Sequence, residues 1–127
     1  MMQYSLNLIK GRYKIAVWGT GYIGLSTMAF FSRKKVPTVG YDIDEKKVKI
    51  INSGKLPIKE LKDWFGFSIK DLVKKKFLSA TNDYGVFNDK SFKVHFIAIP
   101  TEKNGKPYFK ILFNVIDKII ELIKNNK

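Results

Sequence analysis

Residues 14–25 read Lys-Ile-Ala-Val-Trp-Gly-Thr-Gly-Tyr-Ile-Gly-Leu, and residues 38–42 read Thr-Val-Gly-Tyr-Asp. The apolar run from Ile15 to Trp18 predicts a parallel strand that is buried on both faces. It ends where three glycines follow with the spacing G-x-G-x-x-G, at Gly19, Gly21 and Gly24. This spacing indicates a tight turn into a helix, with the backbone open to a pyrophosphate at the helix N-terminus.

An acidic residue completes the pattern. Asp42 ends a second apolar strand, 18 residues after Gly24, where a carboxylate would bind a ribose 2′-hydroxyl. The alternative is that the glycines serve only strand-to-helix packing and that Asp42 caps the next helix. Because strand, glycines, helix, strand and acid all follow in the expected order, the pattern favours a dinucleotide site.

Length and composition restrict the protein class. A chain of 127 residues with 45% hydrophobic content predicts one domain with its own core. The chain has no Cys, which excludes a disulfide framework, a thiolate metal site and a catalytic thiol. No apolar run approaches the roughly 18 residues of a membrane span, and residues 1–10 lack a signal-peptide core. We therefore expect a soluble, cytoplasmic protein with no metal site.

The net charge of +13 raises nucleic acid as a partner. Only two of the 24 basic residues are Arg, however, namely Arg12 and Arg33. Surfaces that read bases more often carry Arg with interleaved aromatic residues. The composition favours lysines spread over solvated faces, and nucleic acid is not the expected partner.

Hydrophobic periodicity places the remaining elements. Residues 1–12 form a leader that either lies on the domain or is disordered, and the domain covers residues 13–127. The expected strands are 14–18, 38–42, 77–80 and 94–99, and the expected helices are 22–33, 45–52 and 110–124. Residues 58–76 predict one or two short helices with Trp64, Phe65 and Phe67 in the core, and residues 101–108 predict a turn.

This alternation predicts an α/β fold, a Rossmann-like doubly wound parallel sheet with strand order 3-2-1-4 and helices on both faces. Ligands bind such sheets at the carboxyl ends of the strands. Four segments should share that edge: 19–24, 42–44, Thr81, and Pro100 with Thr101. His95, the only His, falls inside a buried strand and is expected to be structural.

Several blocks of the chain, in the same order, resemble the nucleotide-sugar 6-dehydrogenases, the UDP-glucose and GDP-mannose dehydrogenase group. The matching blocks are residues 14–25, 39–44 with Lys47 and Val48, 51–54 with Pro57 and Ile58, 78–83, and 96–101. The resemblance covers only the N-terminal NAD-binding domain of that family. In the family, Asp and Ser commonly open the helix that corresponds to residues 110–124. This chain has Tyr108-Phe109-Lys110 at that point, which weakens the N-cap of the helix.

The resemblance implies a function in polysaccharide biosynthesis, the oxidation of a sugar C6 alcohol to a carboxylate with NAD. The family's catalytic Cys, Lys and Asn lie in later parts of its chains, so no catalytic residue is expected here and the domain alone should be inactive. Carried over by position, Gly19, Thr20, Gly21, Tyr22, Ile23 and Gly24 would hold the pyrophosphate. Asp42 and Ile43 would hold the adenosine ribose, Lys47 would reach the adenosine side, and Pro100 and Thr101 would border the nicotinamide.

Two further expectations follow. The carboxylate of Asp42 favours NAD over NADP, because it repels a 2′-phosphate. The strand at 94–99 should form a sheet edge, which predicts self-association, most simply as a homodimer through this edge or through the last helix. A non-catalytic NAD/NADH-sensing Rossmann module is the alternative function, but the blocks at Pro57-Ile58 and 96–101 favour the dehydrogenase family.

Overall fold

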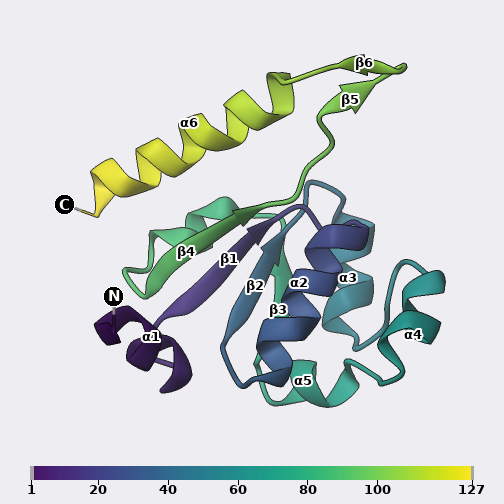
Figure 1. The fold of residues 1–127 in the computed structure, drawn as a ribbon, viewed down its shortest axis with the longest axis vertical. Helices are drawn as coiled ribbons and strands as arrows, with labels where there is room; N and C mark the ends of the chain where they lie inside the picture. The colour runs from purple at the N-terminus through teal and green to yellow at the C-terminus, as the bar shows by residue number, and fades with distance from the viewer. Residues whose placement is uncertain (1, 127) are drawn as a thin grey trace.

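A four-stranded parallel sheet forms the centre of the computed structural model, which describes residues 2–126 (Figure 1). The strands are β1 (Lys14–Trp18), β2 (Thr38–Tyr41), β3 (Leu78–Thr81) and β4 (Phe92–Ile97). Their order is β3-β2-β1-β4 and every pair is parallel. The predicted fold class and strand order are confirmed.

Four helices cover one face of the sheet: α2 (Tyr22–Arg33), α3 (Glu45–Asn52), α4 (Glu60–Phe65) and α5 (Lys70–Lys74). Ile15 and Val17 of β1 pack on this side with Leu25 and Met28 of α2 and with Ile51 of α3. Val48 and Ile51 both face inward, as the spacing of apolar residues predicts. Residues 58–76 hold the two short helices α4 and α5, in agreement with the prediction.

The 3₁₀ helix η1 (Tyr84–Asn88) and the long helix α6 (Lys110–Asn125) cover the opposite face (Figure 1). Ala16 and Trp18 of β1 point to this side, where they pack with Phe87, Val115 and Leu122. Because alternate residues of a strand face opposite ways, β1 is buried on both faces, as its apolar sequence predicts. The first turn of α6 has no side-chain cap, which agrees with the weak N-cap expected there.

The leader lies on the domain, which is one of the two alternatives that the sequence left open. Residues of the leader form α1 (Met2–Ile9), and Leu8 packs against the core cluster on the same face of the sheet as α2. The backbone oxygen of Asn7 accepts hydrogen bonds from the amides of Arg12 (2.9 Å) and Tyr13 (3.1 Å). These bonds turn the chain from α1 directly into β1.

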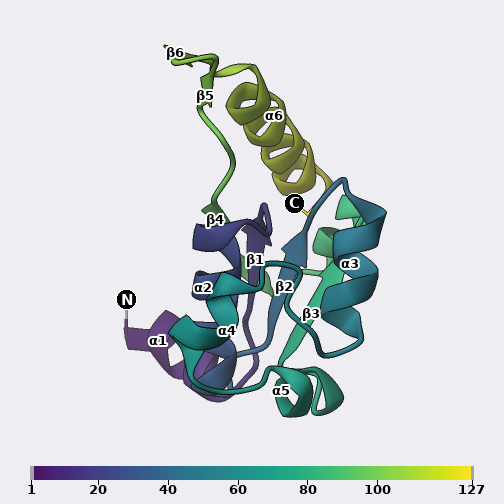
Figure 2. The same ribbon diagram turned by 90° about the vertical axis from the view of Figure 1, so that its right-hand side faces the viewer.

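Several details differ from the prediction. β3 begins one residue later than expected, β4 runs over 92–97 in place of 94–99, and η1 was not predicted. The predicted turn at 101–108 contains the hairpin β5 (Glu102–Lys103) and β6 (Lys106–Pro107), which projects beyond the carboxyl ends of the strands (Figure 2). The placement of Trp64 in the core was wrong, since its side chain is 83% exposed. The six-residue helix α4 packs inward through Leu61 and Phe65, and Trp64 is left facing solvent.

Candidate cofactor site

The glycine loop lies at the carboxyl end of β1. Gly19 donates its amide to Tyr41 O (2.8 Å) at the end of β2, and it has a φ of +103°, which favours glycine. A Cβ atom on Gly19 would collide with the backbone oxygen of Ala98, and one on Gly24 would collide with the backbone oxygen of Gly19. Backbone packing therefore requires glycine at both positions.

Gly21 is different, because nothing in the chain requires a glycine there. Its φ of −78° and ψ of −158° are open to any residue, and a Cβ atom would have no neighbour within 4 Å. Gly21 is the N-cap of α2, no side chain caps this end, and the first turn holds no acidic residue. The open space beside Gly21 therefore lies at the uncapped N-terminus of α2, where free amides can donate to an anion. This arrangement fits the pyrophosphate of a dinucleotide.

Asp42 follows β2 and is held against the glycine loop. Its Oδ2 accepts hydrogen bonds from the amide of Thr20 (3.1 Å) and from Thr20 Oγ1 (2.6 Å), and its Oδ1 accepts one from the amide of Asp44 (2.9 Å). Burial would raise the pKa of Asp42, but the hydrogen bonds from Thr20 and Asp44 and the charge of Lys47 lower it overall. Asp42 is thus a fixed, ionised carboxylate that is hydrogen-bonded to Thr20, the residue before Gly21.

The alternative function of Asp42 as a helix cap is wrong. The cap of α3 is Asp44, whose Oδ1 accepts from the amide of Lys46 (3.0 Å). Asp42 lies before that cap and bonds to its amide. The acid at position 42 therefore joins two loops at the carboxyl edge of the sheet, where the amide of Asp42 also donates to Thr81 O (3.1 Å).

The other predicted site residues mostly have exposed side chains. Tyr22 (54% exposed) and Ile23 (71% exposed) have open side chains on the first turn of α2, and Ile43 is 82% exposed. Pro100 and Thr101 are exposed and lie on the segment that leads away from β4 to the hairpin (Figure 1).

Sequence reasoning missed two neighbours of the loop and one side-chain contact. A Cβ atom on Gly19 would meet Ile99 Cγ2 at 3.3 Å as well as Ala98, so both residues border the loop. Both belong to the apolar run after His95, which could have indicated them. The contact of the Thr20 hydroxyl with Asp42 was also missed, because no spacing rule connects residue 20 with residue 42.

Trp18, which is buried, and His95, which is half-buried, form a pair on the α6 side of the sheet. Trp18 Nε1 donates to His95 Nδ1 (2.9 Å), and Trp18 also contacts the rings of Tyr41, Tyr84 and Phe87. Burial lowers the pKa of His95, which keeps the imidazole neutral and able to accept this bond. This contact agrees with the expected structural function of His95, but the expectation of a buried strand was wrong, because β4 is only partly buried and Phe96 and Ile97 are exposed.

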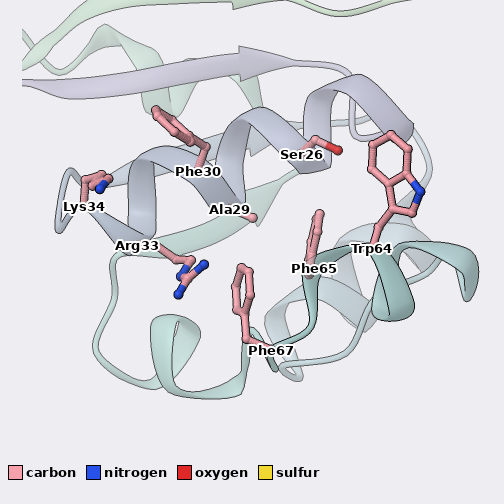
Figure 3. Close-up of a pocket in the computed structure, with 8 residues that line it drawn as sticks. All are labelled: Ser26, Ala29, Phe30, Arg33, Lys34, Trp64, Phe65 and Phe67. Carbon is pink, nitrogen blue, oxygen red and sulfur yellow. The ribbon is translucent and has the colours of Figure 1, made fainter.

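A pocket of about 510 Å³ opens between α2 and α4, along the helix from Ser26 to Lys34 (Figure 3). The stacked rings of Phe65 and Phe67 form one wall, with their centroids 5.3 Å apart. The guanidinium of Arg33 lies 4.1 Å from the centroid of the Phe67 ring. None of the predicted cofactor residues lines this pocket, so it is separate from the glycine loop.

The described residues lack two kinds of feature, a metal-binding cluster and a membrane-spanning helix. Within residues 2–126, no three His, Cys, Asp or Glu side chains come together as a potential metal site. Nor does any helix in the described part of the chain combine the length and apolar character needed to cross a membrane.

Comparison with known proteins agrees with this geometry. A family model described as the NAD binding domain of the UDP-glucose/GDP-mannose dehydrogenase family matches residues 13–127. An uncharacterized protein of Methanocaldococcus jannaschii is 34% identical over 112 residues, which are 86% of this chain and 12% of that protein. The UDP-N-acetyl-D-mannosamine dehydrogenase of Salmonella typhimurium is 36% identical over 91 residues, which are 72% of this chain and 20% of that enzyme.

A solved structure gives the same result. The UDP-D-ManNAc dehydrogenase from Pyrococcus horikoshii superposes with a TM-score of 0.72 at 31% identity, over 86% of this chain and 25% of that one. The chain thus spans between about an eighth and a quarter of the length of these relatives.

Proposed function

Because this chain belongs to the UDP-glucose/GDP-mannose dehydrogenase family and corresponds to its NAD-binding domain, we propose that it is the cofactor-binding part of a nucleotide-sugar dehydrogenase. The observation that carries this proposal is the ionised carboxylate of Asp42, which Thr20 of the glycine loop holds by two hydrogen bonds. The next residue of that loop, Gly21, faces open space. The cofactor is NAD. The relatives named for UDP-N-acetyl-D-mannosamine suggest a UDP-linked sugar as the substrate of the complete enzyme.

We assign the cofactor contacts by position. The backbone from Gly19 through Gly24, including Thr20, Gly21, Tyr22 and Ile23, binds the pyrophosphate, supported by the uncapped N-terminus of α2. Asp42 and Ile43 bind the adenosine ribose, and Lys47 lies on the adenosine side. The nicotinamide half extends toward Pro100 and Thr101, beyond the end of β4.

NAD supplies hydride acceptance when it is bound, and this chain supplies binding and orientation. In this family the sugar alcohol is oxidised through a cysteine thioester, and the chain contains no Cys. We therefore assign no catalytic residue to it. A non-catalytic NAD-sensing module would also bind NAD at such a site, but the similarity to dehydrogenases extends over the whole domain and favours the enzyme.

Titration calorimetry with NAD and NADP tests the proposed site. Asp42→Ala should weaken NAD binding by about 1.5–3 kcal/mol, the range for a hydrogen bond to a charged group. Wild-type protein should bind NAD more tightly than NADP, because the carboxylate repels a 2′-phosphate. Asp71→Ala is the matched control, since it removes an exposed carboxylate on α5. Unchanged NAD affinity in a folded Asp42→Ala protein would remove Asp42 from the site.

We also propose that the chain self-associates as a two-fold dimer. β4 is the end strand of the sheet within residues 2–126, and α6 carries a second apolar stripe besides the one packed on the sheet. This exposed stripe consists of Phe113 (59%), Ile120 (45%) and Ile123 (57%) of α6 and of Phe109 (47%), the N-cap residue of that helix. The stripe and the strand edge are the two surfaces that a second copy can cover.

A further inference from the structure

We propose that the hydroxyl of Thr20 is a positioning group for NAD: it holds one oxygen of Asp42 and leaves the other to accept from the ribose. The inference rests on the proposed NAD site and gives the Thr20 side chain a function separate from the backbone function of the glycine loop. Thr20 is fully buried and comes from the loop after β1, whereas Asp42 comes from the end of β2.

The number of hydrogen bonds that each carboxylate oxygen of Asp42 can accept shows which one is available to the ribose. A carboxylate oxygen accepts in two directions, and both directions at Oδ2 are used, by the amide of Thr20 and by its hydroxyl. Oδ1 accepts only from the amide of Asp44 among the described residues, so one of its directions is unused. Asp42 therefore offers a single acceptor position to a ribose hydroxyl, at Oδ1.

A glycine outside the G-x-G-x-x-G pattern, Gly40, leaves room for the observed conformation of the Thr20 side chain. A Cβ atom on Gly40 of β2 would lie 3.0 Å from Thr20 Cγ2 and 2.5 Å from Met28 Sδ. Gly40 thus makes room for the methyl group of Thr20 and for Met28 of α2. With its methyl group packed there, the Thr20 hydroxyl reaches Asp42 at 2.6 Å, and the carboxylate cannot turn without losing this bond.

Preorganisation is the expected benefit. A carboxylate that is already fixed and ionised loses less rotational freedom when the ribose binds, so affinity is gained without a new contact to the cofactor. The hydroxyl also helps to lower the pKa of Asp42, and it is the largest of the contributions that do so. Removing it should therefore change both the titration of Asp42 and the affinity for NAD.

Thr20→Val tests the proposal, because it replaces the hydroxyl with a methyl group of similar size. We expect the NAD dissociation constant to rise about tenfold, the equivalent of one hydrogen bond to a charged group. An NMR titration of the free protein should show the Asp42 carboxyl protonating at higher pH than in the wild type. Thr20→Ser should restore the NAD affinity to within about twofold of wild type, because it keeps the hydroxyl-to-carboxylate bond.

Thr38→Val is a matched control. Thr38 is also buried and also uses its hydroxyl, which donates to Val36 O (2.9 Å), but it does not contact Asp42. It should change stability without changing the titration of Asp42 or the NAD affinity. If Thr20→Val fails to fold, Thr20→Ser and Thr20→Ala, which differ by one oxygen atom, give the same comparison.

Three outcomes overturn the proposal. They are an unchanged titration of Asp42 in Thr20→Val, equal losses of NAD affinity in Thr20→Val and Thr38→Val, and a shifted titration with NAD affinity unchanged. Failure of the proposed NAD site would give a different result, because Asp42→Ala itself would then leave NAD binding unchanged.

Discussion

At the scale of single residues, the ionisation of Asp42 connects the stability of the domain with its cofactor site. Hydrogen bonds from Thr20 and Asp44 hold the pKa of Asp42 below its ordinary value of 3.8. A carboxyl whose pKa is lower in the folded chain than in the unfolded chain adds stability above its unfolded pKa. That stability is lost as the pH falls through the folded pKa.

This linkage gives a pH prediction. The melting temperature of the wild type should exceed that of Asp42→Asn by a constant amount above about pH 5, and the difference should shrink below the ordinary pKa of Asp. Thermal unfolding followed by circular dichroism between about pH 3 and pH 6 measures it. Asp71→Asn, on the exposed side of α5, shows the effect of removing a carboxylate far from the glycine loop. A difference for Asp42→Asn that persists unchanged to the lowest pH contradicts the prediction.

At the scale of elements, the turn from β1 into α2 contains two kinds of glycine, which mutation can separate. Gly24→Ala should lower the free energy of unfolding by about 1–3 kcal/mol, the usual cost of overpacking. The reason is that its methyl group would collide with Gly19 O. Gly21→Ala should cost less stability than Gly24→Ala, because its methyl group meets no protein atom and the only cost is that Ala is a poorer N-cap than Gly. It should nevertheless weaken NAD binding by a similar amount, since the methyl group occupies the space proposed for the pyrophosphate.

Denaturant unfolding and calorimetry measure the two effects on the same samples. The two variants are each other's control, because each adds one methyl group to the same loop. If Gly21→Ala binds NAD as tightly as the wild type, the open space beside Gly21 does not hold the pyrophosphate. If Gly21→Ala unfolds as easily as Gly24→Ala, its glycine serves packing, and the contrast between the two positions is wrong.

The same elements show what the sequence can and cannot predict. β1, the glycine loop and Asp42 were predictable, because buried parallel strands and tight turns restrict residue type strongly. The core position of Trp64 was not, because a short helix has too few turns for its apolar side to be read from spacing. The contact of Thr20 with Asp42 depends on the pairing of β1 with β2, which brings together residues 22 positions apart.

At the scale of the whole molecule, charge and exposed apolar surface act in opposite directions. The net charge is +13, and within residues 2–126 only two ion pairs form, Lys14 with Asp89 and Lys49 with Glu45. Both pairs are exposed, so they contribute little to stability. Most of the positive charge is therefore unpaired and repels a second copy of the chain. The apolar stripe on α6 favours association, and salt concentration decides which effect dominates.

The proposed dimer should therefore strengthen with salt. Sedimentation equilibrium should show a larger dimer fraction at about 0.3 M salt than at about 0.05 M, because the shorter Debye length screens the repulsion.

Phe113→Gln should weaken the dimer if α6 forms the contact, since Phe113 is 59% exposed and its loss leaves the core intact. Ile97→Lys should weaken it if the edge of β4 forms the contact, because an added charge blocks strand pairing there. Lys124→Gln, in the last turn of α6, removes one charge without removing apolar surface and should strengthen the dimer slightly at low salt. A wild-type chain that stays monomeric at high protein concentration and at both salt concentrations contradicts self-association and leaves the α6 stripe without this function.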